Sequence, residues 1–149
     1  MLAVLAPVTG VAVGLSRVPD PMFAQGLVGP GTAIDPRKEV QEAVAPITGR
    51  IVSFHPHAFV VQSADGKGVL VHLGMNTVRL PLIRGFELLA AQGDEVTAGQ
   101  PLIRWNPAEV VASGISPIVP IVALDADGDV ISRPVSGEVK RGELLFRWA

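Results

Sequence analysis

All three histidines of this 149-residue chain occur in one stretch, residues 55–74, which reads HPHAFVVQSADGKGVLVHLG. His57 and His72 stand fifteen positions apart, on either side of an Asp65-Gly66 dipeptide. Imidazole changes its charge near neutral pH and serves as a nucleophile, an acid, a base or a metal ligand. Two imidazoles joined by one hairpin therefore indicate either a phosphohistidine site, in which the second ring binds the phosphoryl oxygens, or a metal site.

The composition excludes several other chemistries. The chain has no cysteine, so it can form no disulfide, no thiolate zinc site and no catalytic thiol. Its net charge is −2 and its lysines and arginines are dispersed, which provides no basic patch for the phosphate contacts that nucleic-acid binding needs. We therefore expect no nucleic-acid partner.

The Asp65-Gly66 dipeptide, flanked by alternating apolar runs, predicts a two-residue type I′ hairpin turn. This turn would place His72 opposite Phe59, with His57 two residues further along the same strand. Because side chains alternate along a strand, His57 and His72 would then share one face and lie as diagonal neighbours.

The predicted register separates the hairpin into two faces. The first face has no titratable group and is expected to face the core; it carries Ala58, Val60, Val69, Val71 and Leu73. The second face would be an apolar docking surface with two imidazoles, and it carries His57, Phe59, Val61, Leu70 and His72. His55 shares this face by parity, but Pro56 removes a ladder donor beside it, so we interpret His55 as a strand-edge residue.

The rest of the chain has the pattern of an all-β sandwich or barrel, because short runs rich in valine and isoleucine alternate with Gly, Pro, Asp and Asn. Residues 1–149 are expected to form a single domain. Short helical turns are predicted in PMFAQGLV and in NPAEVVASG, where Asn106 would cap a helix that ends at Gly114. The uncharged first sixteen residues predict a buried strand pair, since Pro7 and Gly10 interrupt the run and no basic start precedes it.

Two sets of repeats indicate a folded-over sheet. APVTG at 6–10, APITG at 45–49 and RPVSG at 133–137 each precede a strand-like segment. GDEVTAGQPLI at 93–103 is echoed by GEVKRGELLF at 137–146, which predicts tight turns with glycines at positive φ.

Several motifs carry a family resemblance. The chain resembles the enzyme IIA domain of the glucose class of the sugar phosphotransferase system in VPDPMFAQGLVGPGTAI, EAVAPITGRIVSF, HAFVVQSADGKGVLVHLGMNTV, AAQGDEVTAGQPLI, ASGISPIVPIV and VSGEVKRGELLF. The resemblance implies a β-sandwich of the duplicated hybrid motif. It also implies a phosphocarrier that receives a phosphoryl group from the phosphocarrier protein HPr and passes it to a cysteine on the IIB domain of a glucose- or N-acetylglucosamine-type permease.

The resemblance also assigns roles to residues. His72 of VHLG would accept the phosphoryl group at Nε2, with Nδ1 held by the carbonyl of Gly74, and His57 of HAF would bind the phosphoryl oxygens. A docking rim would be formed by Phe23, Phe59 and Leu70. No cofactor and no metal are implied, the domain is expected in the cytoplasm, and membrane association would be indirect, through the permease.

The chain departs from the family pattern in three places. Asn76 stands in HLGMNTV where the family commonly has an aspartate, so a negative charge that could meet an arginine of a partner is missing. His55-Pro56 replaces a threonine-asparagine pair, in a loop that is one residue shorter. VGPG replaces the usual VGDG, which we interpret as a harmless loop change.

Two alternatives come from other classes. A zinc peptidase of the LytM type uses an H-x-H pair, which HPH at 55–57 matches, but the H-x-x-x-D that such enzymes also need does not occur in the sequence. A regulatory module that binds partners without transferring a phosphoryl group is the other alternative, suggested by Asn76 and the altered loop.

Overall fold

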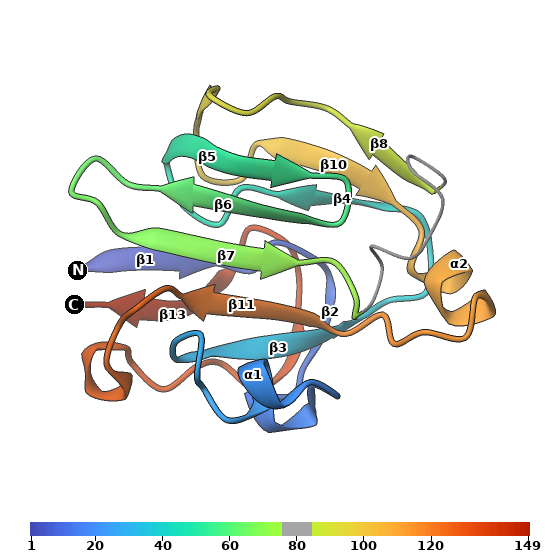
Figure 1. Ribbon diagram of the computed structural model, residues 1–149, viewed down its shortest axis with the longest axis horizontal. Coiled ribbons are helices and arrows are strands. Elements are labelled where there is room, and N and C mark those ends of the chain that lie inside the picture. Colours follow the sequence, from blue (N-terminus) through green and yellow to red (C-terminus); the bar gives the residue numbers. More distant parts are fainter. Residues whose placement is uncertain (76–84) are drawn as a thin grey trace.

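The computed structural model describes residues 1–75 and 85–149, and strands dominate it, as the sequence predicts (Figure 1). The strands are β1 Leu2–Leu5, β2 Gly10–Ala12, β3 Gly31–Pro36, β4 Gln41–Val44, β5 Gly49–His55, β6 Ala58–Gln62, β7 Gly68–His72, β8 Phe86–Leu88, β9 Glu95–Val96, β10 Pro101–Trp105, β11 Val119–Ala123, β12 Gly137–Val139 and β13 Leu144–Trp148. The helices are α1 Pro21–Ala24 and α2 Pro107–Ala112, with 3-10 turns at Leu15–Arg17 and Gly128–Val130.

The strands form a sandwich rather than a barrel. One layer is an eight-stranded sheet in the order β12-β2-β3-β11-β7-β6-β5-β9. Against it pack a two-stranded sheet, β1-β13, and a three-stranded sheet, β4-β10-β8. The buried core between the layers draws on both, with Ile34, Phe59, Val71 and Ile121 from the large sheet and Val4, Ile103 and Phe146 from the small sheets. These sheets do not close into a barrel, so the sandwich alternative is correct.

The strand order reads as two equivalent halves that meet between β11 and β7. In one half β12, β2, β3 and β11 follow one another; in the other half β9, β5, β6 and β7 do so in the mirrored positions. The small sheets repeat the pattern, because β1 pairs with β13 in the same register as β4 pairs with β10. Trp148 opposes Leu2 as Trp105 opposes Gln41. The fold is therefore an internal duplication, as the family resemblance implies.

Reciprocal hydrogen bonds join the two halves at the first two repeated corners. Leu5 N–H donates to the carbonyl of Pro46, and Val44 N–H donates to the carbonyl of Pro7, both at 2.9 Å. The glycine that ends each corner allows close backbone approach: a Cβ on Gly10 would lie 2.2 Å from the Asp35 carbonyl oxygen, and one on Gly49 would lie 2.1 Å from that of Gln62. Sheet pairing at both corners therefore requires glycine.

The second predicted repeat forms the tight turns expected of it. Gly99 has φ 91° and its N–H donates to the carbonyl of Ala45, whereas Gly142 has φ 87° and its N–H donates to the carbonyl of Ala6. These equivalent hydrogen bonds connect the β9-β10 turn to the corner at 45–49 and the β12-β13 turn to the corner at 6–10. The corner at 133–137 differs from the first two, because Gly137 has φ 87° and open space around it.

The N-terminal segment forms two strands, but they do not pair with each other. β1 pairs with β13, whereas β2 pairs with β3 and β12. The corner between them, Ala6-Pro7-Val8, is fully buried and carries the chain from one layer of the sandwich to the other. The strands are therefore as predicted, and the expectation of a strand pair is wrong.

Both predicted helices form, and Asn106 caps the second one as predicted. The side chain of Asp20 accepts a hydrogen bond from Met22 N–H at the start of α1, and that of Asn106 accepts one from Ala108 N–H at the start of α2. Pro107 occupies the first turn of α2, and Gly114 follows the helix with φ 80°. Among the described residues, no helix is long and apolar enough to cross a membrane.

Candidate functional site

The hairpin that carries the histidines closes with three loop residues instead of two. Ser63 N–H donates to the carbonyl of Lys67, and Gly66 N–H donates to the carbonyl of Ser63, both at 2.9 Å. A type I′ turn needs positive φ at both central residues, and here Gly66 has φ 90° while Asp65 does not. The Asp65 carboxylate instead accepts a hydrogen bond from the Ser63 hydroxyl. The predicted turn is therefore wrong by one residue.

The extra loop residue reverses the predicted faces of β6. His72 opposes Ala58, and Phe59 opposes Val71. Phe59 and Val61 are fully buried in the core, whereas Val60 lies half-buried on the other face of the sheet. The faces of β7 are as predicted, since Val69 and Val71 are in the core and the side chains of Leu70 and His72 are on the outer face. Gln62, a polar residue in phase with Val60, is the sequence signal that predicts this arrangement.

His57 lies in a turn rather than within a strand. His55 pairs with Ala58 where β5 and β6 meet, so Pro56 and His57 form the two-residue connection between those strands. The carbonyl of His57 accepts a hydrogen bond from Leu73 N–H at 2.6 Å, which fixes the turn against the end of β7. The His57 and His72 rings meet edge to face, with centroids 5.2 Å apart. The structure thus brings the predicted pair of imidazoles together. A turn does this, rather than the alternation of side chains along one strand.

The two nitrogens of His72 have different environments. Nδ1 lies 2.5 Å from the carbonyl oxygen of Gly74. Because a carbonyl oxygen only accepts, Nδ1 carries the proton and donates, which leaves the lone pair on Nε2. Gly74 reaches this position through a φ of 82°. The expected contact between Nδ1 and Gly74 is present, and His72 is held as the tautomer with a free Nε2 lone pair.

Helix α1 covers one side of the His72 ring. Phe23 of α1 meets His72 edge to face, with ring centroids 5.9 Å apart. Phe23 is 9% exposed and belongs to a small cluster on the outer face of the sheet that includes Val18, Ala33, Met75 and Val122, with Leu70 packed against it. Phe23 and Leu70 therefore border the histidines as predicted. Phe59 does not, because it is in the core.

Burial makes the neutral form of both imidazoles more favourable. It lowers the pKa of His72 below the ordinary value of 6.5, although the bond to the Gly74 carbonyl and the Asp20 carboxylate act in the opposite direction. Burial, followed by the charges of His72 and His55, lowers the pKa of His57 to about 4. Near neutral pH both rings are therefore uncharged, and the Nε2 lone pair of His72 is available as a nucleophile.

His55 is the exposed last residue of β5, in agreement with its interpretation as a strand-edge residue, and it also contacts His57. Its ring stacks on His57, with centroids 5.9 Å apart and an interplanar angle of 29°. The sequence pattern does not predict this contact, because it favours a strand position for His57 and the contact depends on a turn. A second departure from the family pattern, Asn76, lies outside the described residues.

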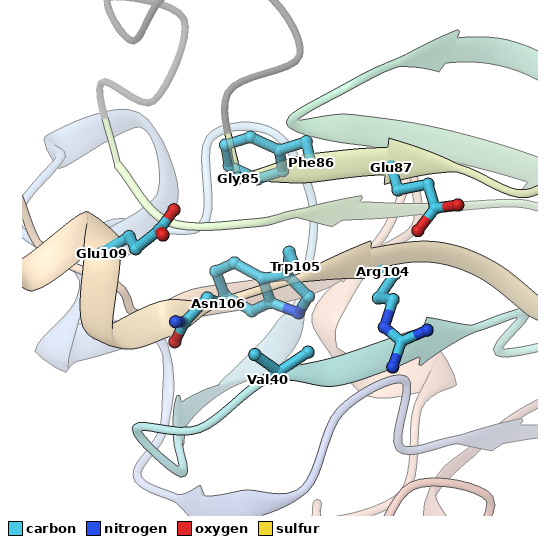
Figure 2. Close-up of a pocket in the computed structure, with 8 residues that line it drawn as sticks. All are labelled: Val40, Gly85, Phe86, Glu87, Arg104, Trp105, Asn106 and Glu109. Carbon is cyan, nitrogen blue, oxygen red and sulfur yellow. The ribbon is translucent and has the colours of Figure 1, made fainter.

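A separate pocket lies away from the histidines, between β8, β10 and the start of α2 (Figure 2). Phe86 and Trp105 stack within it, with centroids 6.1 Å apart, and the charged groups at its border are Glu87, Arg104 and Glu109. In the part of the chain that the structure describes, no group of three or more His, Cys, Asp or Glu side chains is placed to hold a metal ion.

Comparison with known proteins decides between the sequence interpretations. The family model of the phosphoenolpyruvate-dependent sugar phosphotransferase system, EIIA 1, matches residues 2–129. The chain belongs to this family. It is a phosphocarrier of the sugar phosphotransferase system and, as such, a phosphotransferase. The interpretation as a phosphocarrier of this system rather than a peptidase is confirmed.

Individual relatives agree with the family assignment. The glucose-specific EIIA component of Staphylococcus aureus is 40% identical over 128 residues, which cover 85% of this chain and 75% of that protein. The glucoside-specific EIICBA component of Staphylococcus carnosus is 38% identical over 145 residues, 96% of this chain and 20% of the longer protein. The structure of glucose permease IIA from Mycoplasma capricolum superimposes with a TM-score of 0.87 and 34% identity, covering 97% of this chain and 94% of that one.

Proposed function

We propose that His72 is the phosphoryl acceptor of this EIIA domain and that Nε2 is the reacting atom. The observation that carries the proposal is the bond from Nδ1 to the Gly74 carbonyl, which leaves the lone pair on Nε2 beside the second imidazole. The lowered pKa of His72 supports it, because a protonated ring would have no lone pair with which to attack phosphorus.

In this proposal His57 binds the phosphoryl group. Its ring is neutral near pH 7, so one nitrogen donates a hydrogen bond to a phosphoryl oxygen. The arriving negative charge raises the pKa of His57, because opposite charges favour the protonated ring. A proton gained there strengthens the bond to the transferred group and compensates its charge.

The donor and acceptor are HPr and a IIB domain. In the first step the Nε2 lone pair of His72 forms a bond to phosphorus while the donor's N–P bond breaks and returns its electron pair to the imidazole of phospho-HPr. In the second step a IIB cysteine thiolate forms an S–P bond, and the electron pair of the Nε2–P bond returns to His72. Relatives that join IIA to IIC and IIB in one EIICBA chain support a permease as the acceptor, and glucose-specific relatives favour one of the glucose or N-acetylglucosamine type.

The docking surface for both partners is the outer face of the sheet around the two rings. Phe23 and Leu70 border His72 there, and Val60 of β6 extends the apolar surface next to Leu70. We place the whole of residues 1–149 in a single EIIA domain that acts in the cytoplasm, where HPr reaches it, and that meets the membrane through the permease.

The test is a reconstituted transfer. The protein is incubated with phosphoenolpyruvate, the kinase of HPr, and HPr, and its intact mass is measured before and after mild acid treatment. We expect one acid-labile phosphoryl group on the wild type and none on His72→Ala, with circular dichroism showing that both are folded. Phosphorylation of His72→Ala would contradict the assignment. Loss of the group to an added IIB domain distinguishes a carrier from a module that only binds partners.

A further inference from the structure

His57 is oriented by ring contacts rather than by hydrogen bonds. Among the described residues its ring nitrogens have no hydrogen-bond partner, although its backbone carbonyl accepts from Leu73. A histidine at a reactive site is usually oriented through the hydrogen bond that its second nitrogen makes, as His72 is here by Gly74. The ring contacts of His57 are with His72 on one side and with His55 on the other.

The backbone fixes the relative positions of His55 and His57. His55 is the last residue of β5 and is paired with Ala58, the first residue of β6. The two residues between them are Pro56, whose ring restricts φ, and His57 itself. The Cβ atoms of both histidines are thus held by the strand ends, and stacking restricts the remaining rotation of the two rings.

We propose that His55 is a positioning residue for the phosphoryl-transfer reaction, because its ring stacks on His57 and holds that imidazole edge-on to His72. The inference rests on the proposed function of His57 and His72 and adds to it the residue that sets the orientation of the second ring. His55 remains exposed and does not contact His72 in this arrangement, so it acts through His57.

Charge distinguishes this role from simple packing. The titratable groups that act on His57 are His72 from β7 and His55 from β5, and Asp20 at the start of α1 acts on His72. A positive charge on His55 disfavours protonation of His57, so removal of the His55 imidazole raises the pKa of His57. A nonpolar aromatic ring at position 55 preserves the stack but removes this charge.

The experiment compares His55→Ala with His55→Phe. In His55→Ala we expect the rate of phosphoryl transfer from the protein to a IIB domain to fall on the order of tenfold, less than the hundredfold that a 1 Å displacement of a reacting group can cost. His55→Phe should recover most of that loss, because the stacked ring is restored. Arg50→Ala, an exposed change on the same strand, is the control and should retain the wild-type rate.

Nuclear magnetic resonance of the unphosphorylated variants supplies the second measurement. The ring proton shifts of His57 should change in His55→Ala and return toward the wild-type values in His55→Phe, and the pKa of His57 should rise in both. Unchanged His57 shifts in His55→Ala would overturn the proposal, as would equal transfer rates in His55→Ala and wild type. If the wild type itself accepts no phosphoryl group, the proposed function fails, and the spectra still decide whether His55 holds His57.

Discussion

The two halves of the sandwich share their strand pairing but differ in the chemistry of their outer faces. Leu73 N–H donates to the carbonyl of His57 in one half, and Ala123 N–H donates to the carbonyl of Pro30 at the equivalent place in the other half. His72 opposes Ala58 as Val122 opposes Gly31. The two imidazoles therefore occupy positions at which the duplicated half has Pro30 and Val122.

The difference follows from the connections between equivalent strands. Residues 13–30 join β2 to β3 and carry α1 (Figure 1). Phe23 of α1 belongs to the same buried cluster as Val122. The equivalent connection from β5 to β6 is only Pro56 and His57, so this connection carries no helix like α1. One half thus carries α1 and the other carries the two half-buried imidazoles, and Phe23 of α1 contacts the ring of His72. The two halves of the sandwich therefore share a strand arrangement, but the histidine site occurs in one half alone among the described residues.

The largest expected effect concerns the core beneath the histidines. Phe59 opposes Val71 as Thr32 opposes Ile121 in the other half, and both are buried. Phe59→Thr makes the two halves alike at this position, and we expect it to lower the free energy of unfolding by about 3–5 kcal/mol through the cavity it creates.

Chemical denaturation measures this effect, and Val60→Thr is the matched control. Val60 lies half-buried on the outer face, so its change should cost about 1 kcal/mol or less. Equal costs for the two variants would mean that β6 has the opposite face in the core.

The second largest expected effect concerns the rate of phosphoryl transfer. Glutamine in His57→Gln retains a hydrogen-bond donor but cannot take up or release a proton. It therefore resembles Pro30, the equivalent residue of the other half, which has no titratable side chain. We expect phosphoryl acceptance from HPr to persist, and onward transfer to a IIB domain to fall on the order of a hundredfold, the lower range of acid–base catalysis. Single-turnover assays of the two steps separate them. Loss of acceptance in a folded variant would show that His57 acts in the first step as well.

A third prediction tests whether the covered half can be given the same chemistry. Val122→His places an imidazole at the position equivalent to His72, beneath Val18 and Phe23. We expect the free energy of unfolding to fall by about 1–3 kcal/mol, since the ring overfills a packed cluster. In a His72→Ala background the variant should gain no phosphoryl group by intact mass. Val60→His, on the open face, is the control for stability.

The smallest expected effect is on acid stability. The pKa values of His57 and His72 are lowered in the folded protein, so below pH 6.5 the unfolded chain binds protons that the folded chain does not. Stability should therefore fall as the pH decreases from 6.5 toward 4. His57→Gln should reduce this fall by less than about 1 kcal/mol, because the ring is partly exposed to solvent. Denaturation at pH 7 and pH 5 tests it, and an unchanged pH dependence would contradict the lowered pKa.

The sequence by itself determined the features that depend on neighbouring residues. Asp20 and Asn106 cap the helices because their side-chain oxygens reach amide groups two residues further along the chain. Gly99 and Gly142 mark the equivalent turns because positive φ strongly favours glycine. The local motifs around His57 and His72 likewise sufficed to indicate the family and the pair of imidazoles.

The tertiary structure decided what depends on register and on contact between distant segments. One extra loop residue, Ala64, exchanges the two faces of β6. The Asp65-Gly66 dipeptide alone cannot distinguish a two-residue loop from a three-residue loop, because both place a glycine at positive φ. The duplication places Val122 at the position equivalent to His72, which the short repeats do not reveal. The contact between His55 and His57 exists because β5 ends at His55 and a two-residue turn follows, so it depends on strand pairing rather than on the spacing of histidines in the chain.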